Sequence, residues 1–180
     1  MWEGCVVTTK PREKIAWDAM VAIDCLQKQK PEQMVCITPM IREAEEGKLL
    51  LVCSTILKTE TCKIDGVEPA SQVEMIRGFF ENDYFEFEAV HDWIAEFAAG
   101  LRRDHGLTTF DAIHVATAVF TRTPILLTRD GETAKRKKLL PLDKKIPHRD
   151  PGGPALRIMN PIQYHQMRLA AENPLMNKEI

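Results

Sequence analysis

Residues 109–119 (TFDAIHVATAV) decide how the rest of this chain is interpreted. Their periodicity predicts a helix, because Ile113, Ala116 and Thr117 fall on one face at helical spacing. Asp111 stands in the first turn of that helix, where the helix dipole favours a carboxylate. The stretch therefore predicts a buried helix that begins with an acid.

Residues 124–130 (PILLTRD) follow it and predict a strand that ends in an acid. The apolar run 125–127 is too short for a helix, and Asp130 and a glycine come after it, which favours a buried strand. Open α/β sheets bind their ligands at the carboxyl ends of strands. Two carboxylates such as Asp111 and Asp130, brought together there, cannot both stay ionised without a cation. We expect that cation to be Mg²⁺ or Mn²⁺.

Strands and helices alternate along most of the chain. We expect further strands at residues 15–17, 49–53, 84–87 and 155–159, and further helices at 20–26, 32–47, 70–80, 89–103 and after 161. Such alternation predicts an α/β protein, a three-layer α/β/α sandwich with a mostly parallel central sheet. Within it, Pro39 predicts a kink or break, Gly47 a helix end, and Ser54 the N-cap of a helix that carries Glu60.

The length of 180 residues is enough for one domain with a real core, and a composition with 44% hydrophobic residues is ordinary for a globular protein. We expect an N-terminal arm over residues 1–13, the main domain over 14–160, and a C-terminal helix and tail over 161–180. The net charge of -2 does not by itself argue for or against nucleic acid.

Cysteine usage and hydropathy indicate the compartment. The five cysteines are odd in number and form no C-x-x-C pair, so we interpret them as reduced core thiols. The chain shows neither a secretory signal nor a run of about 18 apolar residues that would span a membrane. These features predict a soluble, cytoplasmic protein without membrane contact.

Four acids stand at comparable places once Asp18, which ends the strand at 15–17, and Glu60 join Asp111 and Asp130. Mg²⁺ takes one or two carboxylates directly and keeps several waters. Such a site can activate water for in-line attack on a phosphodiester. No zinc-type Cys/His spacing, phosphate-binding P-loop or G-x-S-x-G elbow offers another chemistry.

Four segments resemble the acidic motifs of the PIN-domain family, most closely those of VapC-type ribonuclease toxins of toxin–antitoxin pairs. They are residues 15–21 (IAWDAMV), 53–60 (CSTILKTE), 109–118 (TFDAIHVATA) and 126–131 (LLTRDG), in the order of the family. The resemblance covers roughly residues 14–160.

The resemblance places the catalytic acids on Asp18, Glu60, Asp111 and Asp130, with Asp18, Asp111 and Asp130 as metal ligands. A supporting threonine of the family falls on Thr128. The resemblance implies a Mg²⁺- or Mn²⁺-dependent endoribonuclease that leaves a 5′-phosphate and a 3′-hydroxyl. It also implies the toxin of a type II toxin–antitoxin pair, homodimerisation and inhibition by a small antitoxin.

Met20 departs from the family pattern, which has a small polar residue at that place. A thioether is a poor hydrogen-bond partner. The alternative is therefore a catalytically weakened or inactive PIN-like domain that serves as an RNA- or protein-binding module. A receiver-type phosphoacceptor is disfavoured, because the chain lacks the acid pair and the late lysine of such domains.

Each acid also has a purely structural interpretation. Asp18 and Asp111 can serve as helix-terminal acids, Asp130 as a turn residue and Glu60 as a solvated helix residue. Thr128 can bond Asp130 or a metal-bound water, or be an ordinary strand residue.

Other polar residues carry weaker expectations. We expect Asp24 and Asp104 to be solvated or capping residues, and His114 to be satisfied in or near the core. The basic run of Lys135, Arg136, Lys137 and Lys138 can bind an RNA backbone or be ordinary solvated surface. The apolar residues of segment 34–41 fit either a partner groove or core packing.

Overall fold

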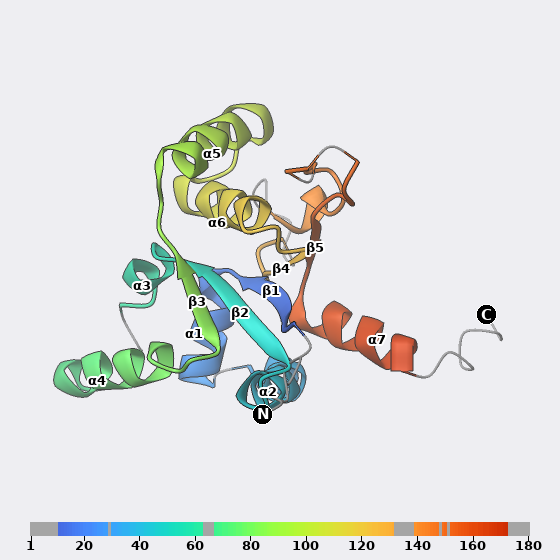
Figure 1. Cartoon of the computed structure of the whole chain (residues 1–180). Coiled ribbons are helices and arrows are strands. Elements are labelled where there is room, and N and C mark those ends of the chain that lie inside the picture. The colour runs from blue at the N-terminus through green and yellow to red at the C-terminus, as the bar shows by residue number, and fades with distance from the viewer. Residues whose placement is uncertain are drawn as a thin grey trace, which may run out of the picture.

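The computed structural model describes residues 11–28, 30–62, 67–131, 139–147, 149–150 and 152–172. In this part of the chain, five strands form one parallel sheet in the order β3-β2-β1-β4-β5 (Figure 1). The strands are β1 (Glu13–Trp17), β2 (Leu49–Ser54), β3 (Phe85–Glu88), β4 (Ile125–Leu127) and β5 (Arg157–Met159).

Helices connect these strands and cover both faces of the sheet (Figure 1). They are α1 (Ala19–Gln27), α2 (Pro31–Glu45), α3 (Leu57–Glu60), α4 (Pro69–Phe80), α5 (Asp92–His105), α6 (Thr109–Phe120) and α7 (Pro161–Glu172), with a short 3-10 turn η1 (Leu140–Leu142). The predicted α/β class, with three layers around a parallel sheet, is confirmed.

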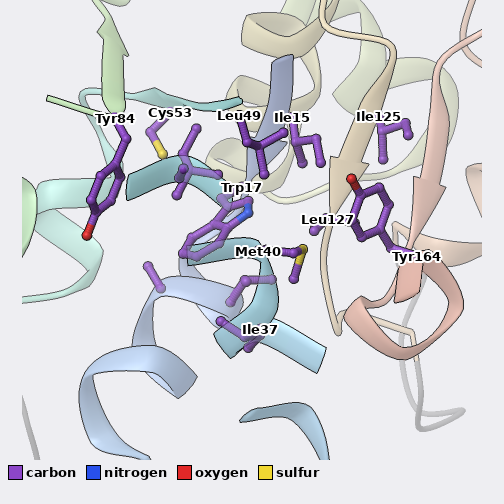
Figure 2. Packing of buried hydrophobic residues seen from close by; sticks show 14 of the residues in the cluster. Ile15, Trp17, Ile37, Met40, Leu49, Cys53, Tyr84, Ile125, Leu127 and Tyr164 are labelled. Carbon is purple, nitrogen blue, oxygen red and sulfur yellow. The ribbon is translucent and has the colours of Figure 1, made fainter. Parts of the chain in front are cut away.

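The period of two along β1 divides the core into two clusters. Ile15 and Trp17 face one side, where Trp17 packs against Ile37 and Met40 of α2 (Figure 2). Burial of Ile37 and Met40 in this cluster shows that both contribute to the core. Tyr164 of α7 is buried in the same cluster, and α7 packs against α2 on this side of the sheet.

The second cluster lies on the opposite face, beneath α5 and α6. Ala16, Leu126 and Ile158 of three neighbouring strands face it. Because helices cover both faces of β1 and β4, every residue of these central strands from Ile15 onward is apolar and buried.

Two local expectations are corrected. Helix α2 is not broken at Pro39 but runs on to Glu45. Ser54 is not an N-cap but the last residue of β2, and α3 has no side-chain cap. The helix ends where it was predicted to end, with Glu46 as its C-cap and Gly47 directly after it. Gly47 has a φ of 72°, and Lys48 N donates to Glu43 O at 2.9 Å.

The expectations for the cysteines, for membrane-spanning helices and for the two ends of the chain can be compared with the described residues. Cys36 and Cys53 are buried as predicted, Cys25 is half-buried, and the prediction is wrong for Cys62, which is exposed. Across the described segments, no helix has both the length and the apolarity that a bilayer crossing needs. Residues 1–10 of the predicted arm, with Cys5, and residues 173–180 of the tail lie outside the described residues.

Candidate active site

The four predicted acids line one open pocket with a volume of about 330 Å³. It forms where the loops after β1 and β4 meet the first turn of α6 and the end of α3. None of its lining residues among those described is a lysine or arginine. The lining residues are Asp18, Ala19, Met20, Ile23, Glu60, Phe110, Asp111, His114 and Asp130.

Asp18 is the most buried of these acids, with 4% of its surface exposed. It directly follows β1 and caps α1, accepting a hydrogen bond from Val21 N at 3.2 Å. Burial raises the pKa of Asp18 to about 6. His114 and the hydrogen-bond donors oppose this rise in the pKa, and the nearby carboxylate of Asp111 adds to it. Burial thus outweighs His114 and the hydrogen-bond donors, and the carboxyl group of Asp18 keeps its proton to a higher pH than a free carboxyl group does.

Thr128 links the first acid to the last. Its buried hydroxyl donates to Asp18 Oδ2 and accepts from Asp130 N at 2.8 Å. Its own amide donates to Met159 O at 3.0 Å, which fixes the chain just beyond β4. The expected hydrogen bond between Thr128 and Asp130 is present, with the Asp130 amide as its donor, whereas the bond from Thr128 to the Asp18 carboxylate was not expected.

Asp111 is half-exposed and bonded to the N-cap of its own helix. Thr108 Oγ1 accepts from Asp111 N at 3.2 Å and donates to Asp111 Oδ2 at 2.6 Å. The structural interpretation of Asp111 as a helix-terminal acid is thus observed, and the same carboxylate also lines the pocket.

Glu60 approaches the pocket from α3 and pairs with His114 of α6, with 2.7 Å between Oε2 and Nε2. His114 is buried as expected, with 3% exposed, and its Nδ1 has no hydrogen-bond partner among the described residues. Its position one turn after Asp111 is the sequence signal for its place in the site, but the pairing with Glu60 was not expected.

Asp24 corrects another expectation, because it is not solvated but 3% exposed. It forms a two-point ion pair with Arg129, whose Nη2 donates to Oδ1 at 2.8 Å and whose Nε contacts Oδ2. Since Arg129 lies between Thr128 and Asp130, this pair fastens the acid-bearing loop after β4 to α1. Asp104 is exposed, as expected. The basic run at 135–138 lies outside the described residues.

The donor set suits a hard divalent cation, which prefers carboxylate oxygens. The side chains are not arranged around one point, however: within the described ranges, no three His, Cys, Asp or Glu residues form a group that could hold a metal ion. Glu60 and Asp111 bond to His114 and Thr108 instead. Binding would require these two carboxylates to turn from those partners toward Asp18.

Comparison with known proteins yields a likeness in structure. No family model matches the sequence, and no curated protein matches it. A chain of a solved structure, described as VapBC2 from Rickettsia felis bound to a DNA fragment from their promoter, is similar with a TM-score of 0.50 and 11% identity. The match covers 66% of this chain and 89% of that one. It shows a shared fold, the three-layer α/β/α sandwich described above.

Proposed function

We propose that this protein is a Mg²⁺- or Mn²⁺-dependent endoribonuclease of the PIN type. The observation that carries the proposal is the convergence of Asp18, Glu60, Asp111 and Asp130 on one pocket, although they come from four distant segments. Four carboxylates that gather with no lysine or arginine among the described lining residues need a cation to balance them.

In this proposal Asp18, Asp111 and Asp130 hold the ion and Glu60 assists them. When bound, such an ion supplies an activated water and neutralises charge that develops on the phosphate. The hydroxyl of Thr128 bonds both the Asp18 carboxylate and the Asp130 amide, and so holds these two residues next to each other. A phosphate group, itself an anion, can approach this pocket only in company with the cation.

The test is cleavage of a labelled single-stranded RNA in Mn²⁺, with and without EDTA. We expect cleavage by the wild type that EDTA stops, and a rate at least about 100-fold lower for Asp111→Asn, because the lost charge weakens the cation site. Asp104→Asn changes an exposed acid elsewhere and should cleave like the wild type. Equal cleavage by wild type and Asp111→Asn would reject the assignment.

We further propose that the protein is the toxin of a type II toxin–antitoxin pair, forms a homodimer and binds a small antitoxin. The likeness to a chain of the VapBC2 structure supports this. Expression of the chain alone should arrest growth, and co-expression of the neighbouring reading frame should relieve the arrest. Growth that is unaffected by the active nuclease would contradict the toxin role.

A second candidate is a PIN-like binding module without catalysis. It is favoured by the hydrogen bonds that already satisfy Asp18, Glu60 and Asp111 within the protein. Such a module would take up no Mn²⁺ at millimolar concentration, and RNA bound to it would stay intact.

A further inference from the structure

The acid pocket has an apolar side that the proposed hydrolysis does not explain. Met20 and Phe110 line it with 38% and 44% of their surfaces exposed, and the half-buried Ile23 lies beside them. We refer to Met20, Ile23 and Phe110 as the apolar wall. Exposed apolar side chains gathered at a site, rather than scattered singly, mark a contact surface.

Core packing does not account for the wall. Neither Met20 nor Phe110 belongs to either core cluster. Each is the second residue of its helix, Met20 in α1 and Phe110 in α6, so each stands one or two residues from an acid of the pocket. The same two helix starts therefore bring a carboxylate and an exposed apolar group to one opening.

We propose that the apolar wall is a subsite for one unpaired nucleobase, with Phe110 as its stacking platform. The inference rests on the proposed function, since it places the phosphate of the same nucleotide at the acids. Bases stack on aromatic rings whatever their sequence, and the thioether of Met20 is well suited to contact a π-system. A volume of about 330 Å³ lies at the lower end of the range for small-ligand pockets, which suits one nucleotide.

This subsite defines a substrate class. A base within an A-form duplex is paired and stacked between its neighbours, so it cannot lie against Phe110. The site therefore acts on single strands, loops or bulges. An apolar side chain of a protein partner would gain nothing from the four adjacent carboxylates, whereas a nucleotide accompanied by its cation uses both sides of the pocket.

The test measures binding rather than cleavage. A fluorescein-labelled uridine 8-mer and an abasic 8-mer with the same ribose-phosphate backbone are titrated in Ca²⁺, and a gel checks that each probe stays intact. Phe110→Ala should weaken binding of the uridine probe about 5- to 150-fold, the loss expected for one stacked base, and leave the abasic probe unchanged. Phe110→Trp should keep the uridine affinity. Val73→Ala removes an exposed apolar group on α4 and should alter neither probe.

Three results would overturn the subsite. They are an unchanged uridine affinity in Phe110→Ala, an equal loss for both probes, or a loss of binding to the product of the neighbouring reading frame with RNA binding intact. The two proposals fail separately. If the wild type binds RNA in a base-dependent way but cleaves nothing, the subsite stands and the nuclease is rejected. If Phe110→Ala cleaves normally and its uridine affinity is unchanged, the nuclease stands and the subsite is rejected.

Discussion

At the scale of single residues, burial makes the charged form of Asp18 costly in the folded protein. Its pKa of about 6 in the folded protein lies above the ordinary 3.8, because burial disfavours the charged form. The folded state thus binds the proton more tightly than the unfolded chain does. The resulting stability is complete below pH 3.8 and is lost as the pH rises through about 6.

Asp18→Asn should therefore stabilise the metal-free protein at pH 8 and change its stability little at pH 4. Each tenfold difference in proton affinity is worth about 1.4 kcal/mol, so the gain at pH 8 is at most about 3 kcal/mol. The asparagine Oδ1 can still accept from Val21 N, and its Nδ2 can donate to the Thr128 hydroxyl oxygen where that hydroxyl now donates to Asp18 Oδ2. Urea denaturation of both proteins at the two pH values measures the difference, with Asp104→Asn as control. A variant less stable than the wild type at pH 8 would contradict this account of Asp18.

At the scale of elements, the Asp24–Arg129 pair ties α1 to the loop that carries Asp130. Removing one partner of a buried ion pair leaves an uncompensated charge and costs roughly 3–5 kcal/mol. We expect that loss in the unfolding free energy of Asp24→Leu and of Arg129→Met. Combining Asp24→Leu with Arg129→Met should recover much of it. Single and combined losses that simply add would show that the pair does not couple the two elements.

Two glycines, one after a helix and one within a helix, allow a matched test of what a positive φ costs. Gly47 has a φ of 72° after α2, whereas Gly78 lies within α4, and an added Cβ would meet nothing within 4 Å at either. Gly47→Ala should lower the unfolding free energy by about 1–2 kcal/mol through the left-handed conformation alone. Gly78→Ala should raise it by about 0.5–1 kcal/mol, since alanine loses less backbone entropy. Effects of the same sign at both positions in thermal unfolding would contradict this.

At the scale of the whole molecule, local pattern predicted the layers of the fold well. The apolar runs at 15–17 and 125–127 became buried central strands because helices cover both faces of the sheet. A helix break at Pro39 and a helix cap at Ser54 are not observed, because tertiary packing and strand pairing decide such boundaries, and local propensity does so only weakly.

The site was predictable only in part, for a reason of distance along the chain. The placement of acids at strand ends and helix starts follows from local pattern. The partners of Glu60 and Asp24 do not, because His114 lies 54 residues and Arg129 105 residues away. Periodicity also does not reveal that Phe110 stays exposed beside Asp111. The exposure of Phe110 depends on the opening between the starts of two helices that lie far apart in the sequence.

The central claim is that one divalent-cation site is formed together by the carboxylates of Asp18, Glu60, Asp111 and Asp130. Isothermal titration of the wild type with Mn²⁺ tests it most directly, alongside Asp18→Asn, Asp111→Asn and the control Asp104→Asn. The account predicts millimolar or tighter binding by the wild type and the control, and affinity at least about tenfold weaker in the two site variants, each of which removes one charge. An absence of heat in the wild type, or equal binding by all four proteins, would contradict it.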